Sequence, residues 1–218
     1  MTSNQILRVA VFGASGNIGR HVVDQLLAAG HIVTAYVRNP AKLSTTHPNL
    51  TVIQGELDDP TGVARAVDGV DAVISALGPT LRRGATGTPI SDGTRTIISA
   101  MKAAGVRRFI GLATPSVADS RDQPTLKAKV LPVMARVAFP NALTELVGMT
   151  EAVTSSDLDW TNARITSPND RPAKGTVRAG FLGRDRVGSA MSRADIASFL
   201  VGQLTDDTYH RAAPAISN

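Results

Sequence analysis

The sequence predicts an α/β protein with a doubly wound parallel sheet, helices on both faces, and a small irregular lobe toward the C-terminus. Two observations support this prediction. Short aliphatic runs alternate with segments of helical periodicity over roughly the first 115 residues, as in sheets whose strands are joined by crossover helices. Hydrophobic residues make up 43% of the chain and aromatic residues only 4%, and an aliphatic core suits a buried parallel sheet. With 218 residues, we expect one domain spanning 1–218.

The elements of the first half follow from periodicity and from residues that begin or end helices. Gly30 and Gly105 are placed to end two helices, and Asp59 with Pro60 gives an N-cap followed by proline at the first helical position. Runs of β-branched and aliphatic residues mark the strands. The predicted strands are 6–12, 32–37, 50–54, 71–76 and 107–113, and the predicted helices are 16–29, 59–67 and 91–104.

The regular pattern weakens after Thr114. Four prolines in 115–140 predict loop and broken helix. Glycine and proline also interrupt 166–188, so we expect these two segments to form the substrate-side lobe. Regular structure is predicted between and after them, as a helix over 141–156, a sixth strand over 159–165, and a last helix over 191–204 with Ser192 as its N-cap.

A glycine-rich loop joins the first strand to the first helix, with the spacing Gly13-x-x-Gly16-x-x-Gly19. Gly13 can make the tight turn, Gly16 lets the backbone approach a pyrophosphate, and Gly19 permits close packing of helix on strand. The helix N-terminus favours phosphate through its free N–H groups and its dipole. A plain turn is the alternative, but the strand-loop-helix setting favours a dinucleotide site built from Gly13, Ser15, Gly16, Asn17, Ile18 and Gly19.

The end of the second strand predicts which dinucleotide binds. Sites that prefer NAD carry an acidic residue here, whereas an arginine can accept the 2′-phosphate of NADP. This chain has Arg38 with Lys42 four residues later and no acid between them. Arg38 can hold a phosphate with two hydrogen bonds, assisted by Lys42 and Ser15. The sequence therefore favours NADP(H), the alternative being that Arg38 is an exposed loop cation.

Four segments together resemble a known family. They are "VFGASGNIGRHVVDQLLAAGHIVTAYVRNPAKL", "VIQGELDDPTGVARAVDGVDAVISALG", "TRTIISAMKAAGVRRFI" and "SSDLDWTNARI". They resemble the atypical short-chain dehydrogenase/reductase family, in particular its small NmrA-like and flavin reductase (biliverdin reductase B)-like members. The resemblance covers nearly the whole chain and is most specific before residue 115. It implies a Rossmann fold with NADP(H) as the usual cofactor.

The resemblance also implies roles for residues that follow the third to sixth strands. It places Glu56 and Leu57 beside the adenine, and Thr114 where the family has a serine or threonine near the nicotinamide. It places the remaining positions along the ribose and pyrophosphate (Ala76, Leu77 and Gly78) or beside the nicotinamide (164–167, including Arg164 and Ile165). All of them lie at or just after the carboxyl ends of predicted parallel strands, where ligands of such sheets bind.

The catalytic Tyr-x-x-x-Lys pair of the larger short-chain dehydrogenase family is missing. The two tyrosines, Tyr36 and Tyr209, are followed four residues later by Pro40 and Ala213, and the segment 141–153 has neither tyrosine nor lysine. Hydride transfer to a flavin, quinone or similar conjugated acceptor needs no protein acid, so we expect a reductase of that kind with Thr114 in an orienting role. The alternative is a non-catalytic NADP(H)-binding sensor of the NmrA type that acts through a protein partner.

Composition excludes some chemistry and leaves other questions open. The chain has no cysteine, and its four histidines show no metal-ligand spacing, so we expect surface histidines and no metal site. Glu145, Glu151 and Asp92 are expected to be solvated or capping residues, the alternative being that they face the cleft. The apolar run near the start is too short for a signal or membrane segment, which predicts a cytoplasmic protein. Oligomeric state is not predicted.

The net charge is +5, and 164–193 holds seven basic residues against two acidic ones. We expect a solvated basic face, because no compact basic block or basic helix stripe with interleaved aromatics occurs. An anionic cofactor, an acidic substrate or a nucleic acid are the alternatives. Nucleic acid is the least favoured of these partners.

Overall fold

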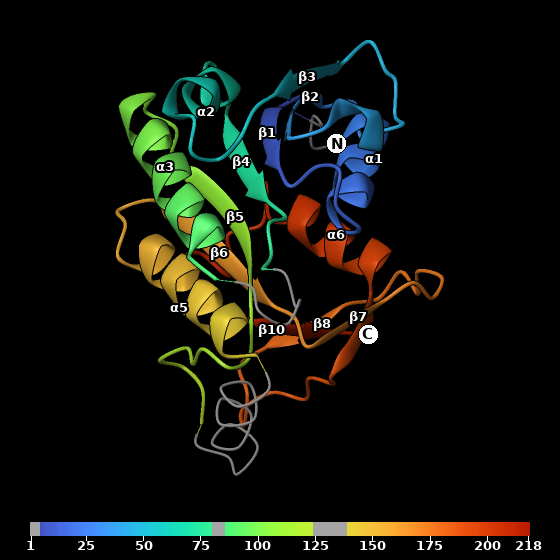
Figure 1. Cartoon of the computed structure of the whole chain (residues 1–218). Coiled ribbons are helices and arrows are strands. Elements are labelled where there is room, and N and C mark those ends of the chain that lie inside the picture. Colours follow the sequence, from blue (N-terminus) through green and yellow to red (C-terminus); the bar gives the residue numbers. More distant parts are fainter. Residues whose placement is uncertain (1–4, 80–85, 124–138) are drawn as a thin grey trace.

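The computed structural model, described for residues 5–79, 86–123 and 139–218, is built around one eight-stranded sheet (Figure 1). The strand order is β3-β2-β1-β4-β5-β6-β10-β8. Paired strands are parallel, except that β8 runs antiparallel to β10. The predicted doubly wound fold is confirmed. The strands are β1 (Arg8–Phe12), β2 (Ile32–Val37), β3 (Leu50–Gln54), β4 (Ala72–Ser75), β5 (Arg108–Ala113), β6 (Asp159–Arg164), β8 (Arg178–Gly180) and β10 (Ala215–Ser217).

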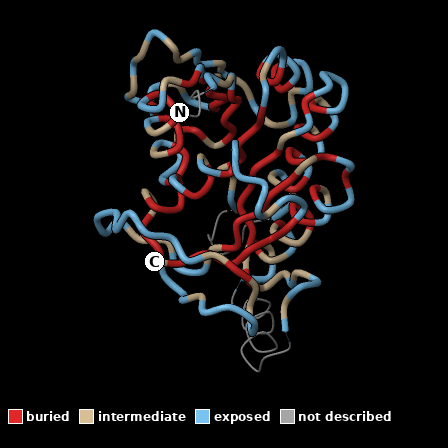
Figure 2. Tube along the Cα trace, turned by 180° about the vertical axis from the view of Figure 1, so that it is seen from behind, coloured by how far each residue is buried: buried red, intermediate tan, exposed pale blue. Residues whose placement is uncertain are grey.

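Helices cover both faces of the sheet (Figure 1). On one face lie α1 (Gly19–Ala28) and α6 (Arg193–Gly202), and on the other α2 (Pro60–Val67), α3 (Pro89–Ala103) and α5 (Pro140–Thr154). Alternate residues of each central strand point to opposite faces, so Val9 and Val11 of β1 join one apolar cluster and Ala10 and Phe12 the other. Figure 2 shows buried segments along the middle of the molecule and exposed segments on the loops and on the outer sides of the helices.

The helix ends lie close to where the sequence predicts them. Gly30 and Gly105 have φ of +83° and +71°, the left-handed conformation expected after a helix. The Asp59 carboxylate accepts the N–H of Thr61 at 3.1 Å, and the Ser192 hydroxyl accepts the N–H of Asp195 at 3.1 Å. The first helix begins at Gly19 and not at Gly16, because the residues before it form the loop.

Three features of the second half differ from the prediction or extend it. The segment 166–188 was expected to be irregular, but it contains β7 (Ser167–Asn169) and β8. The first of these pairs with β9 (Ala190–Ser192) in a separate two-stranded sheet. The unpredicted strand β10 pairs with β6 and β8. Of the predicted loop over 115–140, the part 124–138 lies outside the described residues.

Two of the buried polar side chains bear on predictions made from the sequence. His31 was expected at the surface, but only 6% of it is exposed and its Nδ1 accepts the N–H of Leu7 at 3.1 Å. Burial lowers the pKa of His31, which keeps the ring neutral as an acceptor. Glu145 has the expected capping role, since its carboxylate accepts the N–H groups of Ile90 and Ser91 at 3.1 and 2.7 Å.

In the part of the chain that the structure describes, no helix is both long enough and apolar enough to cross a bilayer. Within the same ranges, no three histidine, aspartate or glutamate side chains gather as metal ligands would.

Candidate functional site: a dinucleotide cleft

The glycine-rich loop lies at the centre of the sheet, where the strand order reverses between β1 and β4. Gly13 has a φ of +74°, and a Cβ built on it would lie 2.9 Å from the carbonyl carbon and oxygen of Ala76, just after β4. A Cβ on Gly19 would lie 2.1 Å from the Gly13 carbonyl oxygen. Both positions therefore need glycine, as the sequence predicts, so that the loop fits closely between β4 and α1.

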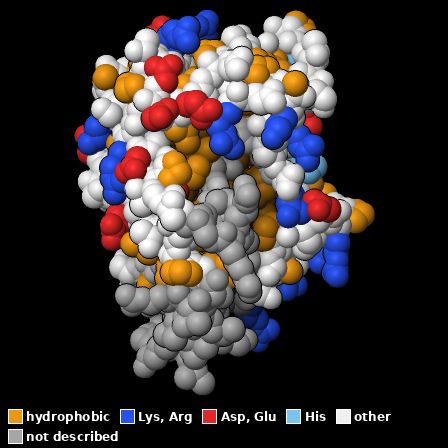
Figure 3. Space-filling view, in the orientation of Figure 1, with side chains coloured by type: hydrophobic (Ala, Val, Ile, Leu, Met, Phe, Trp, Pro, Cys, Tyr) orange, Lys and Arg blue, Asp and Glu red, His pale blue; other side chains and the backbone are white. Residues whose placement is uncertain are grey.

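A cavity of about 1280 Å³ opens beside this loop. Figure 3 shows it as a hollow with acidic side chains on one side of its upper rim and basic side chains on the other. The ends of β1 to β4 and the first turns of α3 form its walls. The lining residues are Gly13, Ser15, Gly16, Tyr36, Val37, Arg38, Asn39, Lys42, Gly55, Glu56, Leu57, Asp58, Ala76, Leu77, Gly78, Thr88, Pro89, Ile90, Asp92, Gly93 and Thr96.

Most of the predicted cofactor-binding residues line this one cavity. Ten do so, from Gly13 in the loop to Gly78 after β4. Six others do not: Asn17, Ile18, Gly19, Thr114, Arg164 and Ile165. Asn17, Ile18 and Gly19 continue the loop into α1, whereas the last three follow or end β5 and β6.

Arg38 and Lys42 supply the basic side of the cavity. Both are exposed, and Lys42 ends the short 3₁₀ helix η1 (Pro40–Lys42). The Asn39 side chain accepts the N–H of Ala41 at 3.0 Å and so fixes the turn between the two cations. Among the described residues, neither cation has a carboxylate within ion-pair distance. Two neighbouring positive charges are therefore available to an anionic ligand such as a phosphate.

Apart from the alternative that Asp92 faces the cleft, which its place in the lining bears out, the sequence did not predict the α3 wall of the cavity. Gly93, on the buried side of α3, comes so close to the opposite wall that a Cβ there would lie 2.6 Å from the Cβ of Leu57. Thr88 and Asp92 are joined by a hydrogen bond of 2.8 Å at the start of the helix. Thr88, just before α3, and the first turns of α3 therefore face the turn after β3. A glycine inside a predicted helix is the sequence signal for such a close approach.

Thr114 follows β5, and β4 lies between this strand and β1, the strand that the glycine-rich loop follows. Its hydroxyl accepts the N–H of Ser116 at 3.3 Å, and its carbonyl accepts the N–H of Val117 at 3.0 Å. The N–H of Ile165 donates to the Ala113 carbonyl at 3.0 Å, which places Ile165 beside Thr114 at the same edge of the sheet. Among the described residues no group accepts the hydroxyl proton of Thr114, which can therefore donate a hydrogen bond to a ligand.

The Arg164 side chain does not reach the cavity, contrary to the role that the resemblance implies for it. It is fully buried, and its two terminal nitrogens donate to the carboxylate oxygens of Asp122 at 2.5 and 2.7 Å. Burial alone would raise the pKa of Asp122, but hydrogen bonds from Arg164 and from the N–H groups of Asp119 and Leu182 outweigh it and lower that pKa. Arg164 therefore anchors the segment after Thr114.

Neither tyrosine lies on the helix where a Tyr-x-x-x-Lys pair would act. Tyr36 lines the cavity at the end of β2. The Tyr209 ring packs against Phe181 and Phe199, with ring centroids 6.3 and 6.0 Å apart. The helix α5 has no tyrosine and no lysine.

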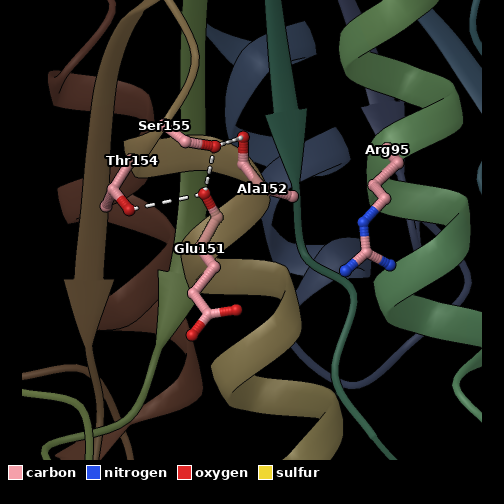
Figure 4. Close-up of a pocket in the computed structure, with 5 residues that line it drawn as sticks. All are labelled: Arg95, Glu151, Ala152, Thr154 and Ser155. Carbon is pink, nitrogen blue, oxygen red and sulfur yellow. Dashed lines mark hydrogen bonds between the residues drawn. The ribbon is translucent and has the colours of Figure 1, made fainter.

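A second pocket, of about 490 Å³, lies between α3 and the end of α5 (Figure 4). The hydroxyls of Thr154 and Ser155 donate back to the Glu151 carbonyl at 3.5 and 2.6 Å. The Arg95 guanidinium donates within its own helix, to Ser91 and Asp92. Because these groups already have partners in their own helices, they do not form a set that converges on a ligand. Glu151 is exposed, as expected.

The comparisons with known proteins agree with this geometry. Residues 13–207 match the model of a family described as NAD(P)H-binding, and the chain belongs to this family. It is 28% identical over 220 residues to (4-alkanoyl-5-oxo-2,5-dihydrofuran-3-yl)methyl phosphate reductase of Streptomyces griseus subsp. griseus, covering 96% of this chain and 67% of the relative. The chain spans only 32 to 34% of the length of the first curated relatives that it matches.

Solved structures share the fold at low sequence identity. One is a short-chain dehydrogenase/reductase from Veillonella parvula DSM 2008 in complex with NADP, with a TM-score of 0.78, 19% identity, and coverage of 98% of this chain and 95% of that one. Another is the anaerobillin reductase ChuY from Escherichia coli O157:H7, with a TM-score of 0.76, 21% identity, and 96% coverage of both chains. These likenesses establish the Rossmann-type fold of short-chain dehydrogenases/reductases.

Proposed function

We propose that this protein is an NADPH-dependent reductase that passes a hydride to a flavin, a quinone or a similar conjugated acceptor. The observation that carries the proposal is the combination of a phosphate loop with two adjacent cations, Arg38 and Lys42, in a chain without a Tyr-x-x-x-Lys pair. The reductase names of two relatives, the Streptomyces phosphate reductase and ChuY, support the reaction class.

The residues of the cleft have separate tasks in this proposal. The loop from Gly13 to Gly19 binds the pyrophosphate at the start of α1. Arg38 and Lys42 bind the 2′-phosphate, with Ser15 beside them. The Thr114 hydroxyl donates a hydrogen bond to the nicotinamide amide or to the acceptor. This hydrogen bond orients the cofactor and the acceptor relative to each other. NADPH supplies the hydride when bound, and water supplies the proton. Positioning then accounts for most of the rate enhancement.

The test is NADPH consumption by the purified protein, followed at 340 nm, with FMN, riboflavin or menadione as acceptor. We expect turnover with at least one of them. Thr114→Val should lower kcat by about tenfold or more, since misplaced reactants lose much of the advantage of proximity.

An inactive wild-type protein would refute the reductase. If such a protein bound NADPH tightly and preferred one redox form, the result would instead support the NADP(H)-sensing regulator.

A further inference from the structure

Tyr36 is a buried aromatic residue in the wall of the cofactor cavity. It is 3% exposed, and its ring lies against Phe12, with centroids 5.3 Å apart. Tyr36 lies near the end of β2, two residues before Arg38. It lines the cavity between the glycine-rich loop and the turn that follows β3. The aromatic ring of Tyr36 packs in the core beside β2. This packing does not explain why the residue carries a hydroxyl group, since buried tyrosine hydroxyls usually have a hydrogen-bond partner.

The Tyr36 hydroxyl is directed at the turn after β3. It donates to the carbonyl oxygen of Glu56 at 2.8 Å. Burial, and after it the Asp59 carboxylate, raises the pKa of Tyr36, so the hydroxyl stays protonated and able to donate at neutral pH. This hydrogen bond links the side chain of one strand to the backbone of a turn whose residues Glu56 and Leu57 line the cavity.

Two glycines leave room for this hydroxyl. A Cβ on Gly55 would lie 2.1 Å from it, and a Cβ on Gly62 would lie 2.6 Å from it. Neither glycine has a left-handed φ, so the backbone does not require glycine at either position. Gly62 lies inside α2, where glycine costs about 0.5 to 1 kcal/mol relative to alanine. At Gly55 the packing gives space for the Tyr36 hydroxyl as the reason for glycine. At Gly62 the reason is space for that hydroxyl together with the Asp59 carboxylate, from which a Cβ would lie 2.5 Å away.

The place of this turn in the cavity connects it to the cofactor. The turn at 55–58 lines the same cavity as the glycine-rich loop and Arg38, and the family resemblance implies that Glu56 and Leu57 of this turn lie beside the adenine. We propose that Tyr36 is a positioning residue for the adenosine half of the cofactor, acting through its hydrogen bond to the Glu56 carbonyl. This inference rests on the proposed NADP(H) site and not on the reductase activity.

The test is Tyr36→Phe, which removes one hydroxyl group and keeps the ring. We expect the Kd values of NADPH and of 2′,5′-ADP to rise by the same factor, about 3- to 10-fold, the range of one net hydrogen bond. The Kd of reduced nicotinamide mononucleotide, which lacks adenosine, should stay unchanged, as should kcat at saturating NADPH. Gly55→Ala, which displaces the hydroxyl from the other side, should give the same pattern.

Tyr209→Phe is the matched control, because it makes the same change in the other tyrosine of the chain and should alter none of these Kd values. The proposal would be overturned if Tyr36→Phe bound 2′,5′-ADP as tightly as the wild-type protein does. Equal weakening of 2′,5′-ADP and of the mononucleotide would also overturn it, since that is the result of a general loss of structure. A wild-type protein that binds NADPH but reduces no acceptor would refute the reductase alone.

Discussion

Asp122→Asn should destabilise the protein strongly, because it removes the only charge that faces the guanidinium of Arg164 in the described structure. The Arg164 side chain is 0% exposed and that of Asp122 is 10% exposed, and two hydrogen bonds of 2.5 and 2.7 Å join them. The Nε of Arg164 already has no partner among the described residues. Asparagine keeps the shape of the side chain but leaves the buried cation without a counter-charge.

The magnitude follows from the burial of the pair. Removing one partner of a buried ion pair costs about 3 to 5 kcal/mol. For a domain of this size, each kcal/mol lowers the melting temperature by about 2 to 4 °C. Asp122→Asn should therefore lower Tm by about 6 to 20 °C.

Thermal unfolding followed by circular dichroism measures this difference, with Asp170→Asn as the matched control. Asp170 pairs with Arg193 at 2.6 Å, but its side chain is 82% exposed, so its loss should change Tm by no more than about 2 to 4 °C. Equal Tm shifts for the two variants would refute the reasoning. The double variant Asp122→Asn with Arg164→Met should recover part of the lost stability, because the buried cation is then absent and the asparagine carbonyl can still accept a backbone N–H from Asp119 or Leu182.

Three further predictions concern the loop, a helix cap and the response to pH. Gly16→Val should abolish NADPH binding in a fluorescence titration while the circular dichroism spectrum stays native, because a Cβ there lies 3.1 Å from the Gly13 carbonyl and blocks the approach of the pyrophosphate. Glu145→Gln should cost about 1 to 2 kcal/mol in urea unfolding, since it weakens the cap on α3. Burial raises the pKa of Asp195, but hydrogen bonds from Lys174, Ser192, Gly175 and Asn218 outweigh it and lower that pKa below its ordinary 3.8. A lowered native pKa stabilises the fold above the unfolded value, so the advantage of wild type over Asp195→Asn should be full at pH 6 and shrink as the pH falls below about 4.

The local signals in the sequence predicted the central fold well. The residues around Gly30, Asp59, Gly105 and Ser192 end or begin elements through interactions within a few positions, which a single sequence can reveal. The sequence likewise predicted the glycine-rich loop, including the tight turn at Gly13 and the close packing at Gly19 that require glycine. Of the ten predicted residues that line one cavity, five in or after the first two strands follow from the residues themselves, and the five after the third and fourth strands were implied by the family resemblance. They come together because the carboxyl ends of parallel strands meet at one edge of a sheet.

The remaining features depend on contacts between distant parts of the chain. Strand β10 has three residues and exists through pairing with β6 and β8, so no local pattern identifies it. Arg164 turns away from the cavity because Asp122, 42 positions earlier, accepts its charge. His31 is buried because it accepts the N–H of Leu7. Partners of this kind cannot be read from one sequence without the fold.

The preference for NADPH is the central claim, and a fluorescence titration of wild type and Arg38→Ala with NADPH and NADH tests it most directly. We expect wild type to bind NADPH more tightly than NADH. Arg38→Ala should weaken NADPH by about 10- to 150-fold, the range of a charge-assisted hydrogen bond, and change NADH by less than about twofold. Equal affinities of wild type for the two cofactors would contradict the assignment of Arg38 and Lys42 to the 2′-phosphate.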